Sequence, residues 1–287
     1  MNRKKMTLFN YVNGVFLLLL VIVCILPILH VIALSLSERI EAVAGNVTFY
    51  PIGFTLEAYR YVMEDSQFWT SLRVTLTRVL IGVPANILLV VMTAYPLSKA
   101  NSRFHARTFF SWLFVITMLF SGGLIASYIN MTKMGLNGTI WAVLFPAACS
   151  PYTIILMRTF FEQIPTSMEE SAFIDGANDF HVFTKITIPL SKPIISTVVL
   201  LFAVNRWNSW FNEFIYLTDK KLHPLQLVIR SIVLTGESEG ALQAGEVVLG
   251  QSLKYAVVIL AMIPMLILYP LIQKYLVKGI MLGAVKG

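Results

Sequence analysis

The sequence predicts an all-α membrane protein with six transmembrane helices, and its composition and apolar runs support that prediction. Of the 287 residues, 57% are hydrophobic and 13% are charged, with a mean hydropathy of +0.74. Soluble domains usually carry about 25% charged residues. Apolar runs of roughly 20 residues recur along the chain, which is the length that a helix needs to cross a bilayer core. A helix also satisfies its own backbone hydrogen bonds, as lipid demands.

The apolar runs place the six helices in order along the chain. Their expected ranges are about 11–36, 70–97, 108–130, 139–161, 192–217 and 251–276. The first run follows a basic stretch, as in a signal peptide, but it is longer than the apolar part of a signal peptide, so we interpret it as a retained span. Four prolines fall inside the ranges and are expected to kink the helices without ending them: Pro27, Pro84, Pro146 and Pro264.

Basic residues in alternate loops predict the orientation. They cluster before the first range, between the second and third, between the fourth and fifth, and after the sixth. The positive-inside rule makes this side cytoplasmic, and the same clusters explain the net charge of +7 without nucleic-acid binding. The acidic segments 37–69 and 218–250 are then expected outside. Both termini are predicted to be cytoplasmic, and residues 1–287 are predicted to form a single membrane domain.

The sequence carries no pattern of a metal site or of an enzyme. Cys24 and Cys149 lie in apolar runs without disulfide or metal-ligand spacing, and we expect them to be small buried hydrophobes. The four histidines are scattered over different predicted elements, so no metal site is expected. Catalytic residues and a bound cofactor are likewise not predicted. No Gly-x-x-x-x-Gly-Lys-Ser/Thr loop occurs, so the chain has no P-loop for ATP.

An acidic stretch, EESAFIDGANDF at residues 169–180, interrupts the apolar chain between the fourth and fifth ranges. Thr166 with Glu169, or Ser167 with Glu170, fits a capping box, which predicts a short helix starting there. The two glutamates are adjacent on this helix and point in different directions, which argues against a pair of catalytic carboxylates.

The same stretch contains the end of that helix and the start of another. Asp175-Gly176 predicts a turn, and a second short helix is expected with Phe180 and Phe183 on one face. Two short helices with small and apolar side chains are typical of a docking element on the cytoplasmic side. An interfacial loop whose aromatic rings rest on lipid headgroups remains the alternative.

Polar side chains inside the predicted spans mark a candidate solute pathway. Asn205, Asn208 and Asn212 share one face of a helix over 192–217, at spacing i, i+3, i+7. Amides bond sugar hydroxyls, aromatic rings stack on sugar faces, and arginines would meet a cargo's carboxylates. Packing between helices is the alternative for the polar residues of this range. For Trp207 the alternative is an aromatic belt at the membrane interface. The candidate pathway residues are Arg78, Asn86, Asn205, Arg206, Trp207, Asn208 and Asn212.

The acidic stretch resembles the EAA loop of permease subunits of ATP-binding-cassette importers. The family pattern is Glu-Ala-Ala, a glycine, nine residues, and Ile-x-Leu-Pro. The sequence has Glu170-Ser171-Ala172-x-x-Asp175-Gly176-Ala177, and nine residues after Gly176 it has Ile186-Thr187-Ile188-Pro189. Serine replaces the first alanine and isoleucine the leucine.

The resemblance extends over nearly the full length, to carbohydrate-transport permeases. The oligosaccharide branch with aldouronate- and alginate-type permeases is the most similar, and the chain looks like the shorter subunit of a heterodimeric pair. The segments that carry this likeness are Ala94-Tyr95-Pro96-Leu97-Ser98, Phe120-Ser121-Gly122-Gly123-Leu124-Ile125, Pro189-Leu190-Ser191-Lys192-Pro193, Trp207-Asn208 and the ending Lys278 to Gly287.

The resemblance implies a type I importer permease fold in a bacterial cytoplasmic membrane and the import of a sugar, most readily an oligosaccharide. Its partners would be lipid, a second permease subunit, an extracytoplasmic sugar-binding protein, and a dimer of ATPase subunits that hold ATP and Mg. The EAA loop, about 163–191, would couple to the ATPase. The coupling residues would be Glu169, Glu170, Ala172, Asp175, Gly176, Ala177, Phe183 and Pro189.

Three other functions stay open on the residues alone. A self-contained secondary transporter would need acidic residues at mid-membrane, and the first, third and fourth ranges have none in their interiors. A membrane enzyme would need an acid, base or nucleophile cluster near one interface, and none is found. The third function is an importer of the same class that carries a solute other than a sugar. Only the resemblance of the segments named above to carbohydrate permeases argues against it.

Overall fold

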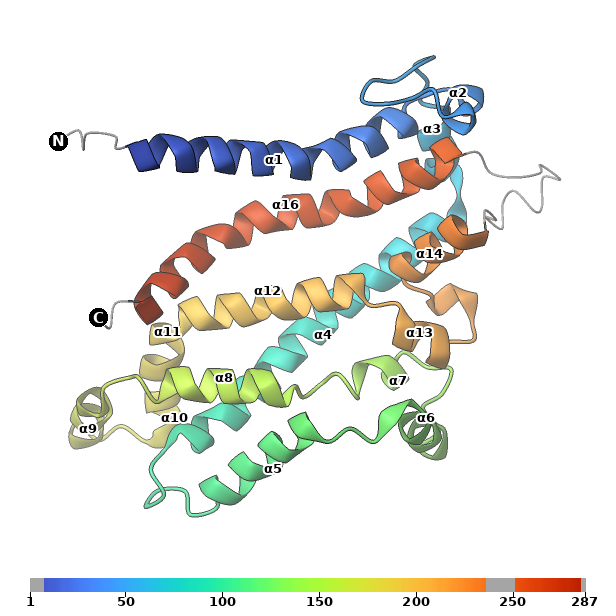
Figure 1. The fold of residues 1–287 in the computed structure, drawn as a ribbon. Coiled ribbons are helices and arrows are strands. Elements are labelled where there is room, and N and C mark those ends of the chain that lie inside the picture. The colour runs from blue at the N-terminus through green and yellow to red at the C-terminus, as the bar shows by residue number, and fades with distance from the viewer. Residues whose placement is uncertain (1–7, 236–250, 285–287) are drawn as a thin grey trace. The chain divides into compact units, whose positions relative to one another are not determined.

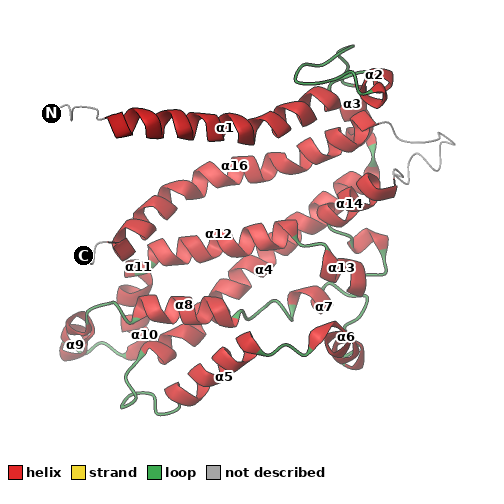
Figure 2. Cartoon of the chain, in the orientation of Figure 1, coloured by secondary structure: helices red, strands yellow, loops and turns green. Residues whose placement is uncertain are grey.

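The computed structural model describes residues 8–235 and 251–284, and every regular element in these ranges is helical (Figure 2). Of residues 235, 251, 268 and 271–284 only the helical backbone is described. The all-α fold class is thereby confirmed. The elements are α1 (Leu8–Ser35), α2 (Arg39–Ala44), α3 (Glu57–Glu64), α4 (Ser66–Ser98), α5 (Arg107–Leu119), α6 (Gly123–Lys133), α7 (Trp141–Leu144), α8 (Pro151–Phe161), α9 (Thr166–Ile174), α10 (Asp179–Val182), the π-helical turn η1 (Phe183–Thr187), α11 (Ile188–Leu190), α12 (Lys192–Asn208), α13 (Phe211–Tyr216), the 3-10 turn η2 (Lys220–Leu222), α14 (Leu225–Thr235) and α16 (Gln251–Ala284).

The chain divides into two compact units. The first comprises residues 1–69 and 228–263, and the second comprises residues 70–227 and 264–287. The boundaries fall inside α4, α14 and α16, and the second unit contains every residue of the EAA-like stretch and of the candidate pathway.

In the first unit, the end of α1 packs against the acidic segment that follows it. Ala33, Leu34, Ala42 and Val47 form a small buried core. The hydroxyl of Ser37 donates to the carbonyl of Ala33 at 2.7 Å and accepts from the backbone N–H of Ile52 at 3.0 Å. These bonds satisfy backbone groups at the helix end and hold the segment that carries α2 and α3.

The rest of α1 is exposed along its length, although it is almost entirely apolar. A contiguous apolar surface of this size is typical of contact with lipid. Its 28 residues also suffice to cross a bilayer core.

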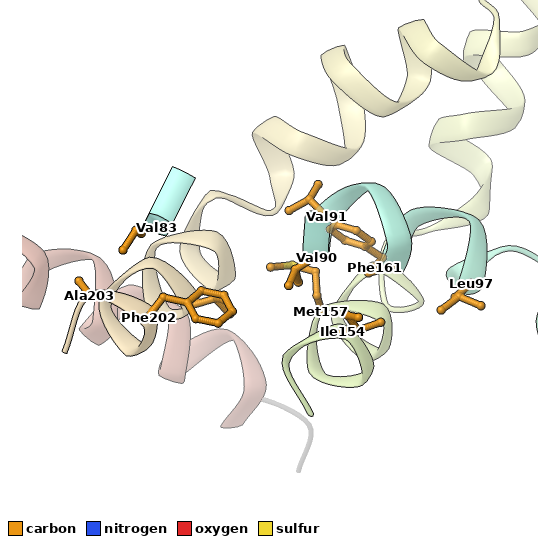
Figure 3. Packing of buried hydrophobic residues seen from close by; sticks show 11 residues of the cluster. Val83, Val90, Val91, Leu97, Ile154, Met157, Phe161, Phe202 and Ala203 are labelled. Atoms are coloured by element: carbon orange, nitrogen blue, oxygen red, sulfur yellow. The ribbon is translucent and has the colours of Figure 1, made fainter. Parts of the chain in front are cut away.

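The second unit has a core of three helices, α4, α8 and α12. Helical spacing brings Ile154, Met157 and Phe161 of α8 to one buried face, at i, i+3 and i+7. This face meets valines of α4, and Phe202 of α12 lies in the same cluster (Figure 3). In Figure 1, α9, α10 and the start of α5 lie at one end of this unit. The helices α6, α7 and α13 lie at its other end.

Three of the six expected spans are not continuous helices, which corrects the prediction. The range 108–130 bends by 116° between α5 and α6, because Phe120 is extended after α5 and Gly123, where α6 begins, has a positive φ of 78°. The range 139–161 is interrupted between α7 and α8. Pro146 lies in this interruption rather than in a kinked helix, and Pro151 begins α8 with Ser150 as its N-cap.

The range 192–217 ends early, at Asn208, because Ser209 adopts an extended conformation before α13. The remaining ranges are helical: α1, α4 and α16 cover them, with Pro27, Pro84 and Pro264 inside. Within the described residues, two helices are long and apolar enough to cross a membrane, Leu8–Ser35 and Ser66–Ser98, and the number rises to at most four if each of two bent pairs forms one span.

Candidate functional site

The EAA-like stretch folds as two short helices separated by a turn, as predicted. The first, α9, begins at Thr166, but its N-cap is Pro165 and no side chain caps it, so the expected capping box is absent. Glu169 is unavailable for capping because it makes an ion pair elsewhere, with Lys99. The helix ends at Asp175, and Gly176 takes a positive φ of 83°, a conformation that favours glycine.

The second half of the stretch is α10, followed by a π-helical turn. The side chain of Asn178 caps α10 by accepting from the backbone N–H of His181 at 2.8 Å. Phe183 begins the π turn η1, and Pro189 lies in α11 directly after it. Proline cannot donate a backbone hydrogen bond, and π turns recur at functional sites in helical proteins.

The end of α4 holds the first helix of the stretch through charge. Lys99 and Glu169 form an ion pair in which each side chain is 12% exposed. The Nη1 atom of Arg103 lies 3.5 Å from Oε2 of Glu169, and its guanidinium stacks 4.3 Å from the ring centroid of Phe173. The partly buried pair of Lys99 and Glu169 attaches α9 to the α4 terminus more firmly than an exposed ion pair would, and Arg103, in the loop after α4, adds an exposed contact.

The same terminus holds the second helix through an aromatic ring. The ring of Tyr95 lies 4.7 Å from that of Phe183, and its hydroxyl donates to the carbonyl of Asp179 at 3.4 Å. The Nζ atom of Lys99 lies 4.1 Å from the Tyr95 ring centroid. One helix end therefore contacts both halves of the stretch, a contact that local sequence patterns did not predict.

The opposite side of the stretch is free of such contacts among the described residues. Met168, Ile174 and Phe180 are exposed, and so are Glu170 and Asp175. Ala172 and Ala177 are partly buried beside them. The stretch thus presents apolar side chains and two carboxylates on a surface that the α4 terminus supports from behind.

A second polar cluster lies within the same unit, between α4, α12 and α13. Arg78 and Glu213 form an ion pair with side chains 1% and 0% exposed. Ser209 donates to Oε1 of Glu213 at 2.6 Å. Nη2 of Arg206 donates to Oδ1 of Asn86 at 2.8 Å, and Nδ2 of Asn86 donates to the carbonyl of Ala147 at 2.7 Å.

This cluster accounts for the glycine at position 82 and uses the break after α12. A Cβ atom at Gly82 would lie 2.5 Å from Nε of Arg206, so the arginine crosses α4 where no side chain is present. Glu213 reaches Arg78 from a separate short helix that begins after the extended Ser209. Glu213 was not among the predicted pathway residues, because its partner is 135 residues away in the sequence.

The structure divides the predicted pathway residues into two groups. Arg78, Asn86, Arg206 and Trp207 are buried within the unit. The three asparagines, Asn205, Asn208 and Asn212, are exposed. Asn212 lies in α13 rather than in α12, so the expected single helical face holds only for the other two.

The described residues contain no group of three or more histidine, cysteine or carboxylate side chains that could hold a metal ion. Cys24 and Cys149 are free and exposed, which corrects their expected burial.

Comparisons with known proteins agree with this architecture. A family model described as "Binding-protein-dependent transport system inner membrane component" matches residues 6–282. The "Polygalacturonan/rhamnogalacturonan transport system permease protein YtcP" of Bacillus subtilis (strain 168) is 38% identical, with 99% of this chain and 100% of that protein covered. "Protein LplC" of the same organism is 36% identical, with 100% and 97% covered.

A solved structure has a similar fold. It is described as a bacterial ABC transporter involved in the import of the acidic polysaccharide alginate. One of its chains matches with a TM-score of 0.86 and 32% sequence identity, and the match covers 96% of this chain and 99% of that chain.

Proposed function

Because the chain belongs to the family of binding-protein-dependent transport system inner membrane components and is a permease subunit of a sugar importer, we propose that it carries an oligosaccharide across a bacterial cytoplasmic membrane. An extracytoplasmic binding protein delivers the cargo, and a second permease subunit completes the passage. ATP and Mg are bound by a separate dimer of ATPase subunits, since this sequence has no P-loop.

The proposed topology has six spans, with both termini in the cytoplasm. The basic clusters on alternate loops support this orientation. In this arrangement the breaks after α5, between α7 and α8, and after α12 are interruptions within spans, and the bend before α12 is where the EAA-like stretch joins the fifth span. Irregular backbone at membrane depth is tolerated where protein or a watery cavity surrounds it.

The observation that carries the coupling role is the attachment of the EAA-like stretch to α4. The two short helices expose apolar side chains and carboxylates on one side, while Lys99, Arg103 and Tyr95 hold them on the other. Closure of the ATPase dimer would push this surface, and the contacts would pass the displacement to α4. Glu169 and Glu170 then have different roles: Glu169 anchors α9 to α4, and the exposed Glu170 meets the ATPase.

The remaining predicted coupling residues fit the same arrangement. Gly176 makes the bend between the helices, with Asp175 beside it and the small Ala172 and Ala177 permitting close approach. Phe183 packs on the α4 terminus. Pro189 lies next to the π turn, where the stretch joins α12.

In the proposed passage, the exposed asparagines at positions 205, 208 and 212 meet sugar hydroxyls. The buried Arg78, Asn86, Arg206 and Trp207 hold α4, α12 and α13 together behind them.

Co-purification from native membranes tests the proposal. We expect wild type to bring down an ATPase and a second permease subunit. The double variant Glu170→Lys with Gly176→Pro should still co-purify with the second permease subunit. It should bring down roughly tenfold less ATPase, which corresponds to a loss of about 1.4 kcal/mol in binding free energy. Proline cannot adopt the φ of 83° at position 176.

Glu57→Lys is the matched control, because it makes the same charge change at an exposed glutamate of α3, in the segment 37–69 that is expected on the outer side of the membrane. Equal loss of ATPase in the control would remove the coupling role. If wild type came down alone and moved solute in proteoliposomes without ATP, the importer function itself would be wrong, and an ion-coupled transporter would replace it.

A further inference from the structure

A cavity of about 380 Å³ lies between the start of α5 and α8, apart from the EAA-like stretch and the buried polar cluster. Its walls come mainly from one side of α5, where the lining residues follow each other at helical spacing, and from Arg158 of α8. The α5 residues are Arg107, Thr108, Ser111, Trp112 and Val115. This volume lies within the range of small-molecule binding sites.

The polar wall of the cavity carries one surplus positive charge. Arg107 pairs with Glu162, and Nε of Arg158 lies 3.0 Å from Oε1 of the same carboxylate. Nη1 of Arg158 also donates to Oγ of Ser111 at 2.9 Å, and Nε of Arg107 donates to the carbonyl of Leu97 at 3.0 Å. Two guanidiniums therefore share one carboxylate.

The two arginines keep hydrogen-bonding capacity toward the cavity. Each guanidinium has five N–H donors, and the contacts above use only part of them. The side chains of Arg107 and Arg158 are 25% and 21% exposed, so an anion in the cavity can reach them. A planar guanidinium is well suited to the oxygens of a phosphate group.

The polarity of the cavity changes along α5. Arg107, Thr108 and Ser111 occupy the first turn and its continuation, next to the polar loop that joins α4 to α5. Trp112 and Val115 lie one turn further into the apolar helix, and Trp112 is exposed. Leu113 and Ile116 of the same helix are exposed as well. A charged head next to an apolar wall matches a phospholipid better than a sugar, which has no apolar tail.

From these observations we propose that the cavity binds the phosphate headgroup of an anionic phospholipid, with the start of its acyl chain along Trp112 and Val115. This proposal rests on the proposed function, in which α5 belongs to a span of the bacterial cytoplasmic membrane. A headgroup with one net negative charge, such as phosphatidylglycerol, offsets the surplus positive charge of the Arg107, Arg158 and Glu162 group. Phosphatidylcholine does not, because its ammonium group cancels its phosphate. Basic pockets between membrane helices bind anionic headgroups in this manner.

The test counts the phospholipids that stay bound to the assembled importer. The complex is reconstituted in nanodiscs of equal phosphatidylglycerol and phosphatidylcholine, and retained lipids are counted by native mass spectrometry. We expect wild type to retain phosphatidylglycerol in preference. Arg158→Gln should lower that retention roughly fivefold, the effect of one interfacial cation.

Thr108→Asp is a second variant, which places a negative charge at the exposed cavity rim without removing either arginine. It should lower phosphatidylglycerol retention even if Arg158→Gln fails to assemble. Lys192→Gln is the matched control: it removes one exposed positive charge at the start of α12, outside the cavity, and should retain lipid like wild type.

Three outcomes would overturn the proposal: no preference for phosphatidylglycerol in wild type, equal loss in Lys192→Gln and Arg158→Gln, or displacement of the lipid by an acidic oligosaccharide. The last would place the cavity on the cargo route instead. Sugar uptake and ATPase activity are measured in the same nanodisc and vesicle preparations. Normal uptake without lipid preference removes only the lipid site, whereas absent uptake with lipid retained points to the proposed function as the error.

Discussion

The buried ion pair between Arg78 and Glu213 makes the sharpest prediction about stability. Both side chains are essentially inaccessible, at 1% and 0% exposed, and they join α4 to α13. Glu213→Gln keeps the size and shape of the side chain but leaves the arginine charge without its partner. Removing one member of a buried pair costs about 3–5 kcal/mol. At roughly 2–4 °C for each kcal/mol, the thermal midpoint should fall by roughly 6–20 °C.

The exposed pair between Arg60 and Glu64 is the internal control. Its nitrogen and oxygen lie 3.0 Å apart, and its side chains are 82% and 66% exposed. Exposed pairs four residues apart on a helix contribute about 0.3–0.5 kcal/mol, so Glu64→Gln should lower the midpoint by roughly 1–2 °C. Burial rather than contact distance is expected to separate the two variants.

The assay is thermal unfolding of the purified complex in detergent, followed by size-exclusion chromatography. A double variant, Arg78→Met with Glu213→Gln, removes both charges and should recover most of the lost stability, because no charge is then buried alone. If Glu213→Gln and Glu64→Gln lowered the midpoint equally, or if the double variant were less stable than Glu213→Gln, the reasoning from burial would be refuted.

Three further predictions test separate parts of the structure. Gly82→Ala should lower the thermal midpoint, because its Cβ would lie 2.5 Å from a buried guanidinium and overpacking costs about 1–3 kcal/mol. In Gly14→Ala the added Cβ would meet no neighbouring atom within 4 Å, so this variant should be neutral or slightly stabilising. Equal changes in the midpoint for the two variants would contradict the packing of Arg206 against Gly82. Asn208→Ala should raise the KM for sugar uptake without changing subunit assembly; an unchanged KM would remove this residue from the passage. Glu169→Gln should lower sugar uptake per ATP hydrolysed, and the charge swap Glu169→Lys with Lys99→Glu should restore it; a swap that rescues nothing would exclude the ion pair as the link.

Local patterns in the sequence were sufficient to predict much of the fold. Apolar runs identified the helical ranges, because a helix that contacts lipid or a core must be apolar over its length. Asp175-Gly176 predicted the turn between the short helices, because glycine readily adopts the positive φ that the chain takes at Gly176. The family resemblance of the EAA-like stretch also depends only on residue types and spacing.

Continuity of the helices was beyond these patterns. An apolar composition is compatible with both a straight and a broken span, so the breaks before Gly123, around Pro146 and after Asn208 appeared only in the structure. The glycine and proline signals were present at two of these breaks, but prolines inside other helices, such as Pro84, are tolerated without a break.

The sequence by itself therefore determined the helical class, the apolar surfaces and the two short helices of the EAA-like stretch, because each depends on neighbouring residues. The tertiary structure decided which polar side chains meet. Arg78 pairs with Glu213, which is 135 residues away in the sequence, and Lys99 pairs with Glu169, which is 70 residues away. Both pairs form because α4 and the residue after it pack against elements far along the chain. The same packing buried Arg78 and Arg206, for which both a cargo contact and helix packing were open, and left three asparagines exposed. Burial and charge pairing depend on what surrounds a side chain in space, which its sequence neighbours do not specify.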